Sequence, residues 1–403
     1  MTSDTRVVVI GTGLAGVRLA RRLAELGTPA LLVGEEEHRP YNRVLLAEVL
    51  AGRYGPEVIA LPAPDGLTRG RVTGIDRDAR TVRCADGAVI AYDTLVLATG
   101  SNPVLPPLRG LYTPGRELPE GVHAFRTMDD CLGLSEAVRP GVRAVVIGGG
   151  LLGVSAARAL AVRGAQVVLA QQSERLMERQ LDPAASRLVR RHLAELGAEV
   201  HTECRVRDVR VAGGAVRAVE MADGYTLDAD LVVLACGVHP RVGLARDAGL
   251  AVHKGVLVDD ELRTSDPRIR AIGDCAQHDG TLYGLAAPAL DQADVLARAL
   301  TGDTTARYTG TRALTRLTLA GRDPFDLAAF GEPEPRPGDD VVQLADATRG
   351  TYRKVVVRDD RLVGGVLVGE LGTVGALARA WEGTEPLPGG APLLHLLTND
   401  GGS

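Results

Sequence analysis

Two glycine-rich segments, far apart on the chain, constrain its fold more than any other feature. The first, GTGLAG at residues 11–16, directly follows the apolar run Val7–Ile10; the second, GGGLLG at residues 148–153, directly follows Ala144–Ile147. Each predicts a strand, a tight turn and a helix, the setting of a dinucleotide-binding loop. The helix would offer free N–H groups to a pyrophosphate. Two such loops predict two dinucleotides, most simply a flavin and a nicotinamide that exchange hydride.

Length and charge narrow the class of protein further. The 403 residues are enough for two or three domains, and the net charge of −5 with no basic block gives no sign of a nucleic-acid partner. No apolar run approaches the length of a membrane span, and no signal peptide is evident, so we expect a cytoplasmic protein without a membrane partner. Lysine occurs only at Lys254 and Lys354, a skew towards arginine that is typical of coding bias.

The cysteines indicate what the protein lacks. None of the five forms C-x-x-C or C-x-x-x-x-C, so we expect no redox dithiol, no bound metal and no iron–sulfur cluster. Cys275 lies beside a candidate flavin ligand, but we interpret it as a small buried apolar residue. The internal acceptor that disulfide reductases use is therefore not expected.

The first glycine loop lies in a predicted β-α-β unit, with a strand at 7–10, a helix at 15–26 and a strand at 30–33. An acidic group, Glu35-Glu36-Glu37, follows about 20 residues after the loop, where a carboxylate can bind the hydroxyls of an adenosine ribose. We choose Glu35, at the strand end; the alternative is that all three are solvated loop charges.

The second loop lies in a similar unit, with a strand at 144–147, a helix at 152–163 and a strand at 166–170. Here Gln171 and Gln172 replace the expected acid, and Arg175 follows. Glutamine can bond a 2′-hydroxyl, whereas arginine can accept a 2′-phosphate. Arg175 fits a surface charge equally well, so the choice between NADH and NADPH stays open.

The rest of the chain supplies further strands and a change of pattern. Strands are predicted at 92–100, 230–236 and 269–274, and a helix at 286–300 with Pro288 in its first turn. From about Tyr308 the pattern becomes α+β, with strands at 313–319, 351–357 and 361–368, an Asp359-Asp360 turn and a helix at 374–381. This last part shows no chemistry and is interpreted as an interface, which allows a homodimer.

These motifs, in this order, resemble the pyridine-nucleotide-dependent flavoprotein reductases of the glutathione-reductase structural class. The closer likeness is to the FAD- and NAD(P)H-binding part of assimilatory nitrite reductase large subunits and of nitrate reductase electron-transfer subunits. It is carried by five segments: 39–46 (RPYNRVLL), 175–182 (RLMERQLD), 271–288 (AIGDCAQHDGTLYGLAAP), 308–318 and 352–370.

The resemblance implies an α/β fold with two Rossmann-like, glutathione-reductase-like dinucleotide-binding domains and a C-terminal α+β domain. We expect an FAD-binding domain at 1–112 and 239–306, an NAD(P)H-binding domain at 113–238 and an interface domain at 307–403. The residues implied to hold FAD at its pyrophosphate, ribose, adenine, flavin or ribityl chain are Gly11, Gly13, Leu14, Ala15, Gly16, Glu35, Arg43, Val72, Ala98, Thr99, Gly100, Asp274, Ala287 and Pro288. Those implied for the nicotinamide nucleotide are Gly148, Gly150, Leu151, Leu152, Gly153 and Gly237, together with Gln171 and Arg175.

One departure from related sequences concerns the flavin N5 region. Many ferredoxin-reductase-like relatives carry Tyr-x-Arg-x-x-Leu-Ser-Lys, whose lysine pairs near N5 with a glutamate on the helix after the second loop. The matching segment here places Glu48 at the lysine position and Ser155 at the glutamate position. We interpret the two as a rearranged catalytic pair; the alternative is that Glu48 turns to solvent.

We therefore expect an FAD-dependent NAD(P)H oxidoreductase that passes electrons to a separate redox partner. That partner would be an iron–sulfur protein, ferredoxin, rubredoxin or a nitrite or nitrate reductase component. The chain has no cysteine after Cys275 for the cluster domains of nitrite reductase proper, so it is expected to be only the flavin front end. Two alternatives stay open: an NAD(P)H oxidase or small-molecule (oxygen, quinone) reductase, and a redox-responsive flavin-binding protein with little turnover.

Overall fold

The computed structural model describes residues 6–62, 65–312, 314–319, 324–383, 387 and 393–398. They divide into two compact units, each interrupted along the sequence. The first takes the described residues up to Leu46, then Tyr54–Asn102 and Val238–Thr311; the second takes Ala47–Arg53, Pro103–Gly237 and the described residues from Arg312 onwards. The chain therefore enters and leaves each unit more than once.

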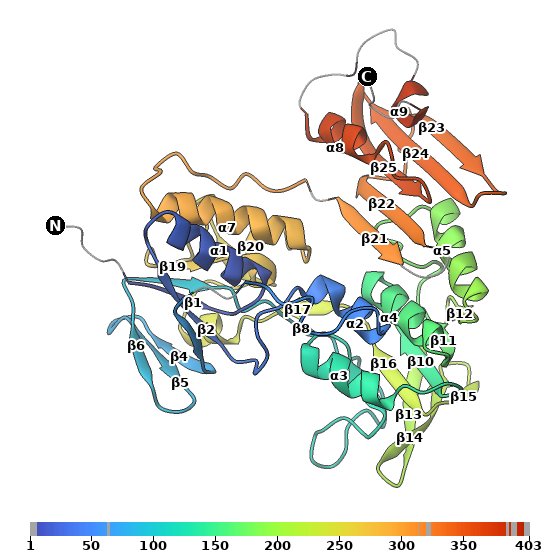
Figure 1. Ribbon diagram of the computed structural model, residues 1–403, viewed down its shortest axis with the longest axis horizontal. Helices are drawn as coiled ribbons and strands as arrows, with labels where there is room; N and C mark the ends of the chain where they lie inside the picture. Colours follow the sequence, from blue (N-terminus) through green and yellow to red (C-terminus); the bar gives the residue numbers. More distant parts are fainter. Residues whose placement is uncertain are drawn as a thin grey trace. The chain divides into compact units, whose positions relative to one another are not determined.

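The first unit is built on a parallel five-stranded sheet with the strand order β19-β7-β1-β2-β3; Figure 1 labels its strands β19, β1 and β2. Its strands are β1 (Val7–Ile10), β2 (Ala30–Gly34), β3 (Leu67–Arg69), β7 (Thr94–Leu97) and β19 (Ile269–Ala271). Side chains alternate between the two faces of a strand. Val7 and Val9 accordingly pack with helices α1 (Leu14–Glu25) and α7 (Ala286–Leu300), while Val8 and Ile10 face a second core.

That second core is closed by a small antiparallel sheet of β4 (Val72–Asp76), β5 (Thr81–Cys84) and β6 (Val89–Ala91). Short elements lie in the first unit or at the positions where the chain passes from one unit to the other. They are η1 (Arg43–Leu45), α2 (Leu46–Leu50), α6 (Gly243–Asp247), η2 (Gly273–Cys275) and the strand pairs β8 (Ser101–Pro103) with β17 (Val238–Pro240) and β18 (Val256–Val258) with β20 (Ala276–His278).

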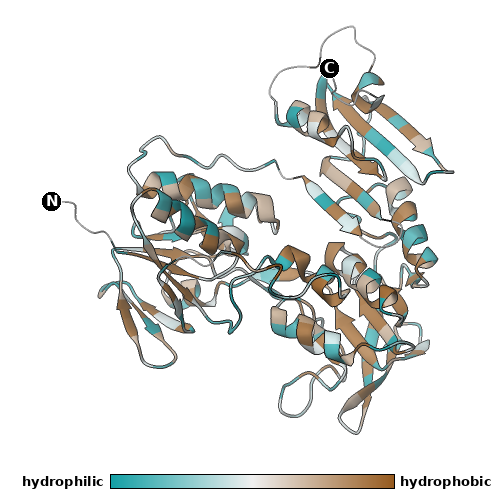
Figure 2. Ribbon diagram, in the orientation of Figure 1, coloured by the Kyte–Doolittle hydropathy of each residue, from teal (hydrophilic) through white to brown (hydrophobic). Residues whose placement is uncertain are grey.

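The second unit contains another parallel five-stranded sheet, in the order β12-β11-β10-β16-β9. Its strands are β9 (Val122–Ala124), β10 (Arg143–Ile147), β11 (Gln166–Ala170), β12 (Glu199–His201) and β16 (Leu231–Leu234). The same unit carries helices α3 (Met128–Ala137), α4 (Leu151–Val162) and α5 (Pro183–Glu195), and a meander of β13 (Val206–Ala212), β14 (Ala215–Met221) and β15 (Thr226–Asp228). Its central strands β10 and β16 are buried on both faces, and Figure 2 shows the apolar character of this sheet.

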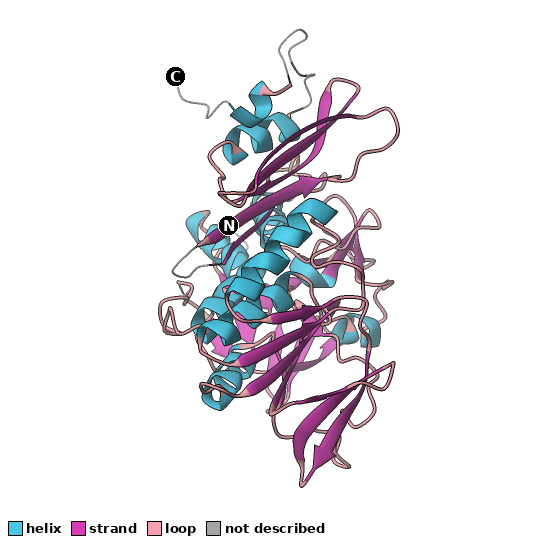
Figure 3. Ribbon diagram, turned by 90° about the vertical axis from the view of Figure 1, so that its right-hand side faces the viewer, coloured by secondary structure: helices cyan, strands magenta, loops and turns pink. Residues whose placement is uncertain are grey.

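The C-terminal part of the second unit is an antiparallel sheet in the order β21-β22-β25-β24-β23, with helices beside it (Figure 3). Its elements are β21 (Thr315–Leu319), β22 (Phe325–Gly331), β23 (Asp340–Asp346), β24 (Thr351–Arg358), β25 (Arg361–Val368), α8 (Val374–Glu382) and α9 (His395–Thr398). Trp381 and Leu377 of α8 pack with Phe330 of β22. The β24–β25 hairpin turns at Asp359 and Asp360, whose φ angles of 49° and 56° are those of a type I′ turn.

These observations confirm the predicted fold class of two Rossmann-like sheets and a C-terminal α+β domain. The strand expected at 269–274 ends earlier, at Ala271, and Asp274 lies in η2 because the chain bends at Gly273 (φ +74°). The strand expected at 313–319 is described from Thr315, and Ala313 lies outside the described residues. Among the described helices, none has the length and apolar character needed to cross a membrane.

Candidate functional site

The three fingerprint glycines of the first loop meet three different demands. Gly11 has φ +118°, and a Cβ there would collide with the carbonyl oxygen of Ala98; a Cβ at Gly16 would collide with the carbonyl oxygen of Gly11. Gly13 differs, because no described atom lies within 4 Å of a Cβ placed on it. The outer glycines therefore permit the turn and the close packing of the helix, and the middle one leaves open space at the start of α1.

The second loop repeats this geometry in the second unit. Gly148 has φ +109° and would meet the carbonyl oxygen of Ala235, and Gly153 would meet that of Gly148. A Cβ at Gly150 again has no described atom within 4 Å. In both loops, the space beside the middle glycine is thus open for a ligand to approach the backbone.

Both open positions lie at helix N-termini, where the first N–H groups have no acceptor within the helix. The first bond within α1 runs from the N–H of Val17 to the oxygen of Gly13 at 3.0 Å, and the first within α4 from Val154 to Gly150 at 2.9 Å. The N–H groups of residues 14–16 and 151–153 accordingly precede the first intrahelical bond. Neither first turn holds an acidic residue, so each end can receive an anion such as a pyrophosphate.

Several predicted flavin ligands meet at the carboxyl edge of the first sheet. The Thr99 hydroxyl donates to the carbonyl oxygen of Arg241 at 2.9 Å, and the Ser101 hydroxyl donates to Oδ2 of Asp274 at 2.8 Å. A Cβ on Gly273 would lie 3.1 Å from Cβ of Ala15, so the Asp274 turn lies against the start of α1. In open α/β sheets this edge is where ligands bind.

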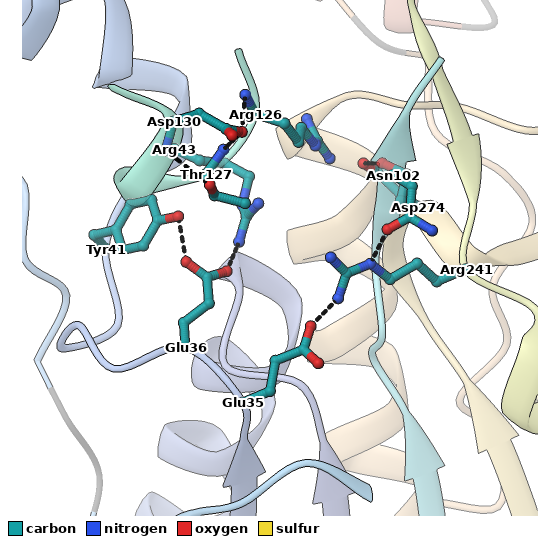
Figure 4. Close-up of polar contacts among 11 residues, drawn as sticks. Glu35, Glu36, Tyr41, Arg43, Asn102, Arg126, Thr127, Asp130, Arg241 and Asp274 are labelled. Atoms are coloured by element: carbon teal, nitrogen blue, oxygen red, sulfur yellow. Dashed lines mark hydrogen bonds and ion pairs between the residues drawn. The ribbon is translucent and has the colours of Figure 1, made fainter. Parts of the chain in front are cut away.

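Glu35 follows β2 at the same edge, where its carboxylate forms an ion pair with the guanidinium of Arg241 (Figure 4). Arg71 lies 3.7 Å from its other oxygen. Arg241 also donates to the side-chain oxygen of Asn102. The sequence analysis did not single out Arg241, because its place beside Glu35 depends on a contact between residues 206 positions apart.

The predicted phosphate ligand Arg43 is held by Glu36. The guanidinium donates to Oε1 of Glu36 at 3.0 Å, and the Tyr41 hydroxyl donates to Oε2 at 2.6 Å (Figure 4). Glu36 therefore pairs with Arg43 and Tyr41, whereas Glu35 at the strand end pairs with Arg241.

In the second unit, Gln171 contacts the glycine loop directly. Its side-chain oxygen accepts from the N–H of Gly149 at 2.7 Å, and its amide nitrogen donates to the carbonyl oxygen of Arg175 at 3.4 Å. The Arg175 guanidinium forms an ion pair with Glu334, on the loop between β22 and β23. Sequence analysis had no signal for Glu334, which lies in a polar, proline-rich stretch without a motif.

Glu48 and Ser155, predicted as a catalytic pair, have different partners. Glu48 forms an ion pair with Arg158, whose side chain is 1% exposed, and Arg53 lies 3.7 Å from its second oxygen. The Ser155 hydroxyl donates to the carbonyl oxygen of Leu151 at 2.8 Å. On α4 the partner of Glu48 is therefore Arg158, three residues after Ser155, the position where the resemblance indicated a partner.

The remaining predicted residues take these places. Val72 is a buried residue at the start of β4, Ala287 and Pro288 lie in the first turn of α7, and Gly100 and Gly237 have φ angles of +71° and +98°. No acidic residue lies in the first turn of α7.

None of the five cysteines, all of which the structure describes, forms a disulfide, and Cys84, Cys131 and Cys275 are buried. Burial raises the pKa of Cys131 and of Cys236 to about 11 and also raises the pKa of Cys275. At neutral pH these thiols are therefore protonated and poor nucleophiles.

Comparison with known proteins places this geometry in a family. The family model described as "Pyridine nucleotide-disulphide oxidoreductase" matches residues 5–293. The model described as "Rubredoxin NAD+ reductase C-terminal domain" matches residues 315–382. The chain belongs to the pyridine nucleotide-disulphide oxidoreductase family. Proteins of this family use FAD and NAD(P)H, which confirms the two expected cofactors and the oxidoreductase class.

Individual relatives of this oxidoreductase include reductases and electron-transfer subunits. It is 35% identical to the assimilatory nitrate reductase electron transfer subunit of Bacillus subtilis, over 91% of this chain and 48% of that protein. It is 31% identical to the probable ferredoxin reductase CtmF of Castellaniella defragrans, over 90% of both chains. The chain spans about half the length or less of the nitrate and nitrite reductase proteins it matches.

A solved structure shows the same likeness in three dimensions. The structure described as the covalent putidaredoxin reductase–putidaredoxin complex superposes with a TM-score of 0.85 at 26% identity, covering 100% of each chain. The resemblance inferred from the sequence motifs is thereby confirmed.

Proposed function

We propose that this oxidoreductase takes hydride from NAD(P)H onto FAD and passes the electrons to a separate iron–sulfur protein. The acceptor would be a ferredoxin, a rubredoxin or a component of a nitrite or nitrate reductase, in the cytoplasm where reduced nicotinamide nucleotides are available. The relatives described above support this direction of electron flow.

One structural observation supports the proposal most strongly. Two helix ends are each open at a middle glycine, Gly13 and Gly150, and the five cysteines form no disulfide and lack redox spacing. A disulfide reductase of this family would need an adjacent dithiol as internal acceptor. Without one, the electrons must leave to an external acceptor.

The residues would act by binding and orientation. The N–H groups of residues 14–16 would bind the FAD pyrophosphate, Glu35 the adenosine ribose and Asp274 the ribityl chain, while residues 151–153 would bind the nicotinamide nucleotide. When bound, FAD supplies the chemistry, accepting two electrons as hydride and releasing them to the acceptor. The first turn of α7 would direct its positive end towards negative charge on the reduced ring.

The test is anaerobic reduction of the FAD-loaded protein by NADH and by NADPH, followed by an acceptor panel. The panel contains a ferredoxin, a rubredoxin, oxygen and a quinone. The proposal predicts that turnover with an iron–sulfur protein exceeds turnover in air. Faster turnover with oxygen or quinone would favour a small-molecule reductase, and a long-lived reduced state with negligible turnover would favour a redox-responsive binding protein; either result would overturn it.

A further inference from the structure

The segment at residues 175–182 links the second glycine loop to the C-terminal domain. At the loop, the N–H of Gly149 donates to Gln171 and its carbonyl oxygen accepts from the N–H of Met177 at 2.8 Å. The carbonyl group of Gly149 thus bonds to this segment directly, and its N–H group bonds to Gln171, which in turn bonds to Arg175. Arg175 begins it and is fixed by the bond from Gln171 to its carbonyl oxygen.

The C-terminal domain contacts the same segment at both ends. Glu334 pairs with Arg175 at the start, and Lys354 lies 2.9 Å from Asp182 at the end. The Arg175–Glu334 pair is partly exposed, at 24% and 55% for the two side chains. The Nε atom of Arg175 is buried and has no hydrogen-bond partner among the described residues, so Glu334 satisfies only part of this guanidinium.

The loop that carries Glu334 is held on both sides. Arg358 of β24 donates to Glu332 at 3.1 Å and to Asp339 at 2.8 Å, and the N–H of Arg336 donates to Asp339 at 2.8 Å. Because one arginine holds residues on each side of Glu334, the loop presents this carboxylate in a defined place.

That place matters for nucleotide choice. In a Rossmann unit, the residue after the second strand meets the adenosine ribose, and a carboxylate there binds the 2′-hydroxyl of NAD. Here β11 is followed by Gln171 and then by Arg175, a cation suited to the 2′-phosphate of NADP. The Glu334 carboxylate places a negative charge beside the Arg175 guanidinium, with which it forms an ion pair.

We propose that Glu334, supplied by the C-terminal domain, is a specificity-determining residue that neutralises Arg175 and thereby favours NADH over NADPH. The inference rests on the proposed function in one respect, that a nicotinamide nucleotide occupies the second glycine loop. A 2′-phosphate approaching Arg175 has to displace the Glu334 carboxylate and is repelled by it, whereas a 2′-hydroxyl carries no such charge.

The test compares the wild type with Glu334→Gln, using FAD-loaded protein. The ratio of kcat/KM for NADPH to that for NADH is expected to rise about tenfold, which corresponds to ~1.4 kcal/mol. The change in this ratio should come mainly from a higher kcat/KM for NADPH. Glu178→Gln is the matched control, because Glu178 is a carboxylate of the same segment that accepts a hydrogen bond from the Ser173 hydroxyl at 2.7 Å. This substitution should leave the ratio unchanged.

A binding measurement that does not depend on turnover gives a second readout. Calorimetry with adenosine 2′,5′-bisphosphate should show tighter binding to Glu334→Gln than to the wild type, while binding of 5′-AMP stays the same. The double variant Arg175→Ala/Glu334→Gln should lose the gain. These results would support Glu334 acting through Arg175.

Two failures are distinguishable. If NADH reduces the wild type but Glu334→Gln keeps the wild-type nucleotide ratio and bisphosphate affinity, the inference is wrong and the proposed function stands. If neither nucleotide reduces the protein and neither adenosine phosphate binds, both are overturned.

Discussion

Lys354 and Asp182 form a buried ion pair, with 2.9 Å between Nζ and Oδ2 and side chains that are only 8% and 4% exposed. The Tyr352 hydroxyl donates to the same carboxylate oxygen at 2.5 Å, and the other oxygen caps α5 by accepting from the N–H of Ala185 at 3.0 Å. One carboxylate thus joins the nucleotide-binding sheet domain to β24 of the C-terminal domain.

Asp182→Asn is expected to loosen the attachment of the C-terminal domain. Asparagine keeps the helix cap but leaves the Lys354 ammonium buried without its counter-charge, which typically costs about 3–5 kcal/mol. Hydrogen exchange should accelerate in β24 and β25, and Asp182→Asn/Lys354→Met should restore much of the protection. Unchanged exchange in the single variant would contradict this role.

The same pair predicts a dependence on acid pH. Burial alone would raise the pKa of Asp182, but hydrogen bonds from Tyr352, Ala185 and Lys354 outweigh it and lower the pKa below the ordinary 3.8. A carboxyl whose pKa is lower in the folded state stabilises the fold above its unfolded pKa. This stability is expected to be lost as the pH falls below about 4, and an acid titration of unfolding should show a smaller loss in Asp182→Asn.

The middle glycines allow a reciprocal test of the two cofactor loops. Gly13 and Gly150 have φ angles of −75° and −76° and open space around a Cβ, so valine fits the fold at either position. Gly13→Val should yield protein largely without FAD, because its side chain fills the place of the pyrophosphate. Gly150→Val should keep FAD, measured by absorbance, and lose reduction by NAD(P)H. Full flavin content in Gly13→Val would show that the first loop is misplaced.

Thiol chemistry is expected to be dispensable. The raised pKa values of the buried cysteines and the lack of redox spacing leave no thiolate to carry electrons. In a variant with all five cysteines replaced by alanine or serine, NAD(P)H should still reduce FAD. Anaerobic absorbance spectroscopy measures this reduction. Circular dichroism and flavin content verify that it folds, and loss of reduction in a folded, FAD-replete variant would restore a cysteine mechanism.

The Glu48–Arg158 pair gives a prediction about the flavin potential. If Glu48 lies near flavin N5, as the sequence resemblance implies, removing its negative charge should favour the reduced flavin. Glu48→Gln is expected to raise the FAD midpoint potential by tens of millivolts, with about 30 mV equal to ~1.4 kcal/mol for two electrons. Arg158→Gln should shift it in the opposite direction. Potentials that match the wild type in both variants would place the pair away from the flavin.

Local sequence signals predicted the two glycine loops, helix α7 and seven of the ten strands of the two parallel sheets, because each depends on residues close together in the chain; strands β3, β9 and β12 of these sheets were not predicted. The β-α-β periodicity and the glycines sufficed for them. Arg241 beside Glu35 and Arg158 beside Glu48 could not be predicted in this way, since each pair forms only when distant segments pack. The same limit applies to Glu334. Strands β22 and β23 were not predicted either, because their short amphipathic runs border a polar loop.

The burial of Lys354 also determines which lysine side chain an amine-reactive reagent can modify. Of its 46 basic residues, 44 are arginines, and of the two lysines Lys254 is exposed while Lys354 is enclosed by its contacts with Asp182. An amine-reactive dye or cross-linker would therefore modify one lysine side chain, in the unit that carries the first glycine loop. The chain thus offers one accessible lysine side chain for attaching a fluorescent reporter, besides the α-amino group that every chain carries.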